Sequence, residues 1–182
     1  MPLLDRARIV QNCYITHDIE ATARRFHDML GIGPFIMGRD PLPAEAVTHR
    51  GKPATEPLDF SRAFVQSGDL NIELIQPHSK EQNAFWDMFG PGEEGLHHVA
   101  IFAENYIEER DAFKAAGFEI ATELMLLPDC TVSFIDTRPV LGHMLELYED
   151  HPLLRDVYQQ TRDLAENWDG KELIVGGLPP VE

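Results

Sequence analysis

Apolar side chains follow first a strand-like and then a helix-like spacing at the start of the chain. The apolar and β-branched residues of 9–16 predict a buried strand. Four apolar residues then recur on one helix face: Ile19, Ala23, Phe26 and Leu30. Asp18 precedes them as a predicted N-cap, and Gly31 follows them where helices commonly end.

The second half of the chain repeats this order of elements. Residues 96–102 predict a strand, residues 106–116 predict a helix, and Gly117 ends it. The remaining strands are predicted at 34–38, 63–69 and 70–75 in the first half and at 118–124, 132–136 and 143–148 in the second. Each half is therefore a strand, a helix and roughly three strands. The fold class is α+β, and two such halves can cover each other's open apolar faces.

The repeat organises residues 1–150 as one domain. Its modules are predicted at 8–77 and 93–150, joined by a linking helix at 79–90. A proline-containing insertion at 38–58 has no clear periodicity, so it is expected to be a long loop, either a lid over a site or plain disorder.

Residues 151–182 are predicted to form a C-terminal helix and tail. The helix begins near Pro152 and carries one apolar stripe. The stripe consists of Leu153, Leu154, Val157, Tyr158, Thr161 and Leu164. We expect it to dock on the domain or on a subunit partner, and it favours a homodimer.

Composition narrows the class of protein. The chain has 182 residues, 43% of them apolar, and its two cysteines are too few for a disulfide scaffold. A formal net charge of −16 opposes binding to nucleic acid and to anionic membranes. The N-terminal charges and the lack of a long apolar run point away from secretion and from a membrane span, so a cytoplasmic location is expected.

Polar residues interrupt equivalent strands of the two halves. The repeat places Gln11 in the first strand over His98 in the fifth, and Glu73 in the fourth strand over Glu146 in the eighth. Because strand side chains alternate between faces, both glutamates point away from their leucine neighbours, toward the side of the sheet opposite the helices. Burying unpaired carboxylates there is costly, and a divalent cation would offset that cost.

The four residues define a mostly oxygen donor set that suits Mn, Co, Ni, Mg or Zn, with water completing the shell. Taken singly, each has a simpler interpretation, such as a solvent-facing glutamate or an edge-strand amide. His97 points to the opposite face from His98 in a strand, so at most one of the two is a ligand. The repeat is what joins the four positions into one metal site.

The chain resembles the vicinal oxygen chelate superfamily, which includes glyoxalase I, methylmalonyl-CoA epimerase, extradiol dioxygenases and bleomycin-resistance proteins. The matching stretches are 11–31, 71–77, 95–102 and 142–149. The resemblance implies two βαβββ modules forming a cupped sheet around one divalent metal. Glyoxalase I carries Gln, Glu, His and Glu in the order of the four positions here. The amino-acid sequence and spacing of 73–78 and 95–101 are, however, closer to those of the epimerases.

Both chemistries move a proton next to a carbonyl. The resemblance implies that Glu73 and Glu146 exchange the proton while Gln11 and His98 hold the ion. The expected enzyme is therefore a metal-dependent isomerase, epimerase or glyoxalase-type lyase. Its small-molecule substrate would be of the 2-oxo, hemithioacetal or acyl-thioester type.

Departures from the relatives limit the choice of substrate and chemistry. Ile15 replaces an arginine that binds glutathione in glyoxalase I, and Arg62 lies near the position of a further acid in the epimerases. Arg62, and Arg50 in the insertion, are candidates for binding a substrate carboxylate. The alternative function is a non-catalytic binding protein of the bleomycin-resistance type. A ring-cleaving dioxygenase is disfavoured because Gln11 stands where those enzymes carry a histidine.

Overall fold

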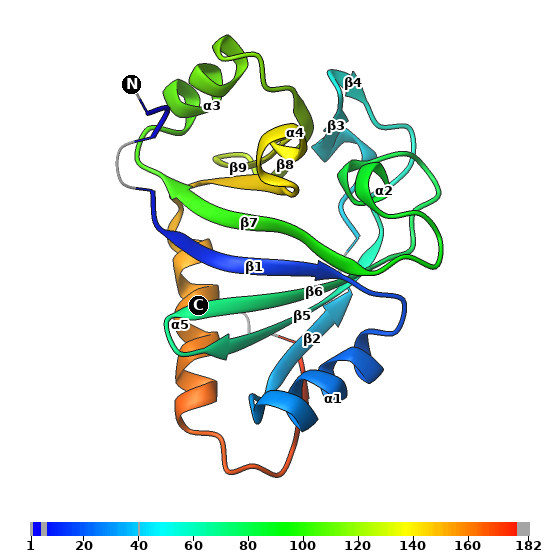
Figure 1. Ribbon diagram of the computed structural model, residues 1–182, viewed down its shortest axis with the longest axis vertical. Coiled ribbons are helices and arrows are strands. Elements are labelled where there is room, and N and C mark those ends of the chain that lie inside the picture. The colour runs from blue at the N-terminus through cyan, green and yellow to red at the C-terminus, as the bar shows by residue number, and fades with distance from the viewer. Residues whose placement is uncertain (1, 5–6, 40, 178–182) are drawn as a thin grey trace.

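The strands of the computed structural model, which describes residues 2–4, 7–39 and 41–177, form one curved sheet (Figure 1). They are β1 (Ile9–Ile15), β2 (Phe35–Arg39), β3 (Val47–His49), β4 (Lys52–Pro53), β5 (Phe60–Ser67), β6 (Leu70–Pro77), β7 (Gly95–Ala103), β8 (Ile120–Leu127), β9 (Cys130–Ile135), β10 (Met144–Glu149) and β11 (Ile174–Gly176). The helices are α1 (Ile19–Leu30), α2 (Ala84–Met88), α3 (Tyr106–Ala115), α4 (Arg138–Leu141) and α5 (Pro152–Glu166), with a 3₁₀ turn η1 (Ala44–Ala46).

The sheet confirms the two predicted βαβββ modules. Its strand order is β11-β2-β5-β6-β1-β7-β10-β9-β8-β3-β4. The first module is β1, α1, β2, β5 and β6, and the second is β7, α3, β8, β9 and β10. The first strand of each module pairs in parallel with its last strand, and β1 and β7 meet antiparallel at the centre. The modules are therefore joined edge to edge by their first strands, as pseudo-symmetry requires.

Helix α1 begins and ends where its capping residues predict. The Asp18 side chain accepts a hydrogen bond of 3.0 Å from the Ala21 amide, which satisfies one of the free N–H groups of the first turn. Gly31 has a φ of 69°, a left-handed conformation that costs glycine little and other residues more.

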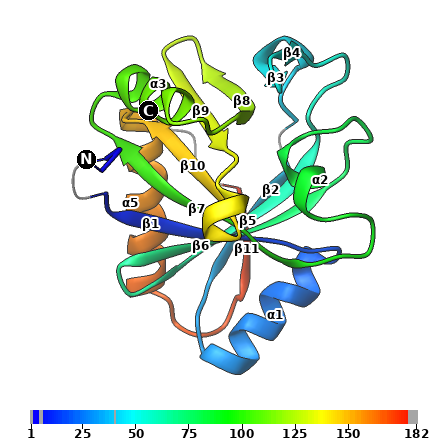
Figure 2. The same cartoon turned by 45° about the horizontal axis from the view of Figure 1, so that its top comes forward.

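Helices α1 and α3 pack on one face of the sheet, which we call the outer face (Figure 2). Ile72 and Leu74 lie under α1, and Leu145 and Leu147 lie under α3. The side chains between them in sequence point to the opposite, inner face. Strand alternation thus separates the apolar contacts under the helices from the polar positions between them.

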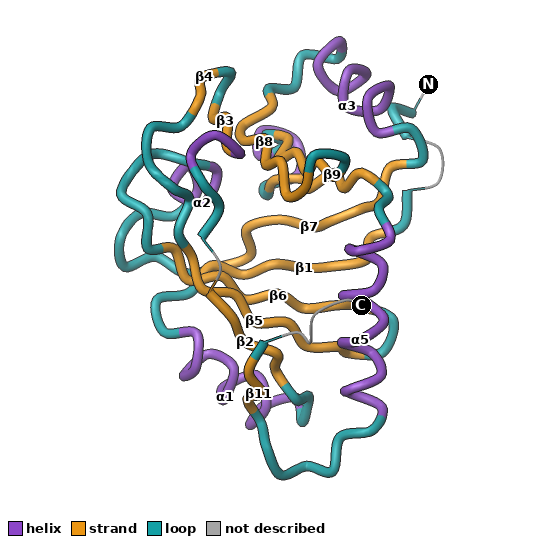
Figure 3. The backbone as a smooth tube through the Cα atoms, turned by 180° about the vertical axis from the view of Figure 1, so that it is seen from behind, coloured by secondary structure: helices purple, strands orange, loops and turns teal. Residues whose placement is uncertain are grey.

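The C-terminal helix packs on part of the inner face. Seen from behind, α5 runs across one end of the strands (Figure 3), and its Leu154 and Tyr158 pack against the inner apolar cluster. The predicted stripe therefore docks on the protein's own sheet, which leaves the homodimer without that support. After α5 the chain adds β11 in parallel to β2, an element that the sequence pattern did not indicate. The last five residues of the predicted tail, 178–182, lie outside the described residues.

The expectation of a structureless insertion at 38–58 was wrong in part. Its residues 47–53 form a hairpin of β3 and β4 that extends the sheet beside β8, and Leu42 bridges to Leu58 by backbone hydrogen bonds of 3.0 and 2.9 Å. Val47 and Leu58 are buried in the inner cluster, which holds the segment to the domain. Residue 40 lies outside the described residues.

The linking helix is much shorter than the predicted 79–90. It spans Ala84–Met88, because the Asn83 side chain accepts hydrogen bonds from the amides of Phe85 and Trp86 and so starts the helix there. No helix among the described residues combines the length and apolar character needed to cross a membrane.

Candidate metal centre

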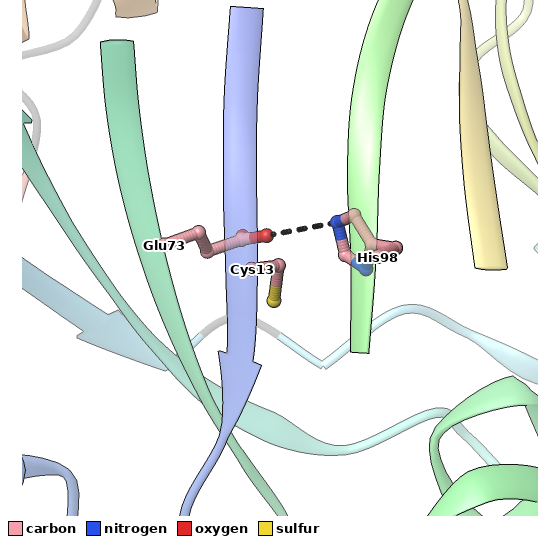
Figure 4. A group of neighbouring side chains, drawn as sticks. All are labelled: Cys13, Glu73 and His98. Atoms are coloured by element: carbon pink, nitrogen blue, oxygen red, sulfur yellow. Dashed lines mark ion pairs between the residues drawn. The ribbon is translucent and has the colours of Figure 1, made fainter. Parts of the chain in front are cut away.

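Three side chains from neighbouring strands meet on the inner face (Figure 4). In the register of the sheet, Cys13 on β1 pairs with Glu73 on β6 and with His98 on β7. Side chains at directly paired positions share one face, so the thiol lies between the carboxylate and the imidazole. Donor atoms of the three side chains all lie within 4.8 Å of one another, and all three residues are buried.

A second row of residues runs beside this one. Gln11 pairs with Asn71 on β6 and with Ala100 on β7, and Ala100 pairs in turn with Glu146 on β10. Glu146 reaches back into the first row, because its Oε2 lies 2.9 Å from the His98 Nε2. The four positions predicted from the repeat therefore occupy two adjacent rows of the inner face.

Both glutamates lie close to His98 Nε2. Glu73 Oε2 lies 3.6 Å from it, and none of the three side chains is more than a tenth exposed. Despite the short distances, His98 Nε2 and Glu146 Oε2 are buried without a well-aligned hydrogen-bond partner among the described residues. Buried polar atoms are nearly always paired, so these two point to a group that would complete the site.

His97 determines which nitrogen of His98 faces the carboxylates. The His97 Nε2 lies 2.9 Å from the Ala84 carbonyl, which can only accept, so this nitrogen carries the proton. Burial, with the His98 charge as a smaller contribution, lowers the pKa of His97 to about 3, so its Nδ1 is an acceptor. It lies 2.8 Å from His98 Nδ1, which must therefore donate. In a neutral His98 the Nε2 then presents a lone pair to the site.

Burial and charge act in opposite directions on the site residues. Burial alone would lower the pKa of His98, but the carboxylates of Glu146 and Glu73 outweigh it and raise this pKa to about 9. Burial also raises the pKa of Glu73, with repulsion from Glu146 adding to it and His98 opposing it. The two carboxylates therefore stabilise a positive charge at the His98 Nε2, which can be a proton or a cation.

A divalent cation fits this donor set. Cys13, Glu73 and His98 offer a compact group of donor atoms, and Glu146 adds a buried oxygen 2.9 Å from His98 Nε2. Imidazole, carboxylate and thiolate are all common ligands of divalent transition metals in proteins.

A cavity of about 240 Å³ lies above the carboxylates. Its charged lining residues are Arg62, Glu73 and Glu146, and Tyr148 lies beside them. The apolar lining comes from the strands, from Leu42, from α2 and from α5: Phe60, Phe64, Ile75, Phe85, Leu124, Leu126, Val132, Phe134, Leu153, Leu154 and Val157. A cavity of this kind gives a small substrate a mostly apolar enclosure with a few charged contacts.

The two predicted substrate-binding arginines are in different places. Arg62 lines the cavity, with its guanidinium 5.8 Å from the centre of the Phe64 ring. Arg50 lies outside it, in the β3–β4 turn, where it pairs with Glu119, with Asp87 at 2.6 Å and with Asp136 at 3.2 Å. The structure therefore brings Arg62, but not Arg50, to the candidate site.

Sequence patterns did not single out Cys13, His97 or the partners of Gln11. The Gln11 amide is held on both sides, by Asn71 Oδ1 at 3.0 Å and by the Tyr148 hydroxyl at 2.9 Å. Cys13 was detectable, because it lies two residues after Gln11 and strand alternation places both on one face. The role of His97 was not, because it depends on a carbonyl of α2.

A family model for the glyoxalase/bleomycin resistance protein/dioxygenase superfamily matches residues 10–132 of the chain. The chain belongs to this superfamily. A search of curated proteins finds no match.

Three solved structures with the same fold are distant from this chain in sequence. A hypothetical protein from Bacillus halodurans C-125 is 20% identical with a TM-score of 0.57, covering 81% of this chain and 96% of its own. Methylmalonyl-CoA epimerase from Mycobacterium tuberculosis is 15% identical with a TM-score of 0.51, covering 84% of this chain and 96% of its own. A methylmalonyl-CoA epimerase bound to methylmalonyl-CoA and NH4+ also reaches 0.51, at 15% identity and 80% and 96% coverage.

Proposed function

We propose that the protein is a metal-dependent isomerase, epimerase or lyase that moves a proton at the carbon next to a carbonyl group. The observation that carries the proposal is that Glu73 and Glu146, on symmetry-related strands, line one cavity and each place an oxygen within 3.6 Å of His98 Nε2. Two carboxylates in this arrangement can remove a proton from a carbon and return one to it.

Each residue has a distinct task in this proposal. His98, oriented by His97, and the carboxylates hold the cation. When bound, the cation would polarise the substrate carbonyl and stabilise the negative charge that develops on its oxygen. Glu146 and Glu73 exchange the substrate proton at the carboxylate oxygens that face the cavity. Arg62 binds a substrate carboxylate, and the apolar wall excludes water from the reacting carbon.

The cavity favours a small reacting group. At about 240 Å³ it lies below the range of about 300–1,000 Å³ that holds whole drug-sized ligands. A 2-oxo acid or the acyl part of a thioester suits this space, whereas the carrier of an acyl thioester would extend outside. Ile15, where glyoxalase I has an arginine, is buried in the inner cluster and offers glutathione no charge.

Exchange of a carbon-bound proton with solvent deuterium tests the proposal. The metal-loaded protein is incubated in heavy water with 2-oxo acids, hemithioacetals and acyl thioesters, and deuterium at the carbon is followed by NMR. We expect catalysed exchange with one of these classes, reduced by about 10²- to 10⁴-fold in Glu146→Gln and in Glu73→Gln. Glu149→Gln is the matched control, because Glu149 lies on the same strand but accepts from the Thr131 amide at 2.9 Å outside the cavity.

Two results would replace the proposal. Binding of one of these compounds without any exchange would make the protein a binding module of the bleomycin-resistance type. Oxygen uptake with an aromatic diol would make it a dioxygenase.

A further inference from the structure

We propose that the thiolate of Cys13, rather than the amide of Gln11, is the donor that β1 contributes to the metal. This inference rests on the metal centre of the proposed function, but not on proton transfer. Gln11 is the residue that aligns with His98 in the repeat, so Cys13 would be a donor without a counterpart in the second module.

The position of Cys13 supports this assignment. It is the central member of the row Glu73–Cys13–His98, paired directly with both neighbours, and its sulfur lies within 4.8 Å of their donor atoms (Figure 4). Its exposure is 0%, so the sulfur faces the site and not the solvent. His98 Nε2 and Glu146 Oε2, buried and 2.9 Å apart, have no well-aligned hydrogen-bond partner among the described residues, which indicates independently that a group binds beside Cys13.

Gln11, by contrast, is already engaged. Its Nε2 donates to Asn71 Oδ1 at 3.0 Å, and its Oε1 accepts from the Tyr148 hydroxyl at 2.9 Å. The Tyr148 hydroxyl in turn accepts from Tyr158 on α5 at 3.3 Å. These bonds run between buried or half-buried groups, so turning the amide toward a metal would leave partners unsatisfied.

A thiolate changes the metals that the site would prefer. A shell of carboxylates, an amide and one imidazole accepts Mg and Mn, whereas sulfur with imidazole favours Zn and Co. The ligand is the deprotonated sulfur, so binding releases the thiol proton to solvent. The structure therefore predicts a zinc- or cobalt-selective site that magnesium does not displace.

Cobalt absorption spectroscopy tests the assignment directly. The chelator-treated full-length protein is titrated with Co²⁺ without oxygen, and the near-ultraviolet sulfur-to-cobalt charge-transfer band is recorded with the visible cobalt bands. We expect one equivalent of cobalt to give both. Cys13→Ser is expected to lose the charge-transfer band and to bind cobalt at least about tenfold more weakly, since even outer partners of metal ligands contribute that much.

Two variants serve as controls. Cys130→Ser removes the chain's other cysteine, which is buried at the start of β9 and does not line the cavity, and should leave spectrum and affinity unchanged. Gln11→Leu should retain the band. A band that persists in Cys13→Ser, or its loss in Gln11→Leu alone, would overturn the assignment.

The outcomes separate this inference from the proposed function. Visible cobalt bands without a charge-transfer band would overturn the cysteine assignment and leave proton transfer standing. A charge-transfer band in a protein that catalyses no deuterium exchange would overturn the proposed function and leave the assignment standing. Failure to bind cobalt at all would overturn both.

Discussion

Among single residues, the adjacent histidines of β7 have different roles: His98 is the proposed metal ligand, and His97 orients it. The expectation that His97 points to the opposite face was wrong, because the register of β1 and β7 shifts by a β-bulge at His97. Its ring packs against Phe85 and Phe134 of the inner cluster, and its Nδ1 lies 2.8 Å from that of His98. The Ala84 carbonyl fixes His97, and His97 fixes His98. A buried neighbour that does not itself face the carboxylates therefore orients a proposed metal ligand, as outer partners of metal-bound histidines commonly do.

Replacing His97 is expected to weaken metal binding. His97→Phe keeps the ring packing against Phe85 and Phe134 but removes the acceptor for His98 Nδ1–H and the donor to the Ala84 carbonyl. We expect metal affinity, measured by chelator competition, to fall about 10- to 100-fold. The free energy of unfolding should fall by about 1–3 kcal/mol, because buried polar groups lose their partners.

His143→Phe is the control for this substitution. The His143 ring contacts the Met144 carbonyl at 2.8 Å and does not line the cavity. Unchanged metal affinity in His97→Phe would show that His98 does not need His97 for its orientation.

Asp136 is expected to make stability depend on acidity. The Arg138 guanidinium, bonded to it at 2.7 and 2.6 Å, and Arg50 lower the pKa of Asp136 to about 2, against the opposing effect of burial. Because the folded-state pKa lies below the ordinary value of 3.8, the carboxylate stabilises the fold above about pH 4. This stabilisation is lost as the pH falls toward 2.

Urea unfolding between pH 4 and pH 2 measures this contribution. The wild type should lose up to about 2 kcal/mol more than Asp136→Asn over this interval. Asp28→Asn, on an exposed position of α1, should behave as the wild type. Parallel curves for the wild type and Asp136→Asn would contradict the prediction.

At the scale of elements, α5 closes the inner face of its own sheet. Leu153, Leu154 and Val157 line the cavity, while Arg155 lies over the Phe102 ring at 3.8 Å. One stripe of the sequence thus predicted the helix and its apolar face correctly, apart from Leu164, which is exposed. The stripe does not tell on which surface α5 packs. That depends on where β10 ends relative to the sheet.

Two leucines of α5 are expected to differ in their effect on stability. Leu154 packs against the inner cluster, whereas Leu164, further along the predicted stripe, is 37% exposed. Leu154→Ala should lower the free energy of unfolding by about 1–2 kcal/mol, less than the 2–5 kcal/mol of a fully buried leucine. Leu164→Ala should change it by less than about 0.5 kcal/mol. Equal effects in urea unfolding would mean that α5 does not dock as described.

The β3–β4 hairpin shows why the insertion was harder to predict. Its strands are short, and its pairing partner, β8, lies more than seventy residues further along the chain. Proline and charge in 38–58 are typical of a loop. The ion pairs of Arg50 with Asp87 and Asp136 join segments that no local pattern connects.

At the scale of the whole molecule, the two modules share the site across their seam. Cys13 and Glu73 come from the first module, and His98 and Glu146 from the second. A bound cation would tie the halves together and favour the folded state over the unfolded chain. The homodimer stays a prediction, because the apolar stripe of α5 that favoured it packs on the protein's own sheet.

Added zinc is expected to raise the melting temperature. At a concentration one hundred times the dissociation constant, binding adds about 2.7 kcal/mol of stability. For a chain of this size that corresponds to roughly 5–10 °C in a thermal melt. His98→Ala should show no such shift. A shift of equal size in that variant would place the bound zinc elsewhere, and no shift in the wild type would contradict the metal centre.

Sequence patterns alone were enough to predict the modules, their helices and the face on which Glu73 and Glu146 lie. These features depend on local periodicity, capping and alternation, which act over a few residues. The three-dimensional arrangement was needed to see that Cys13 lies between Glu73 and His98, that His97 orients His98, and that Arg62 rather than Arg50 reaches the cavity. Those contacts follow from strand register and from pairings between distant segments, and a shift of one residue in register would move every side chain to the other face.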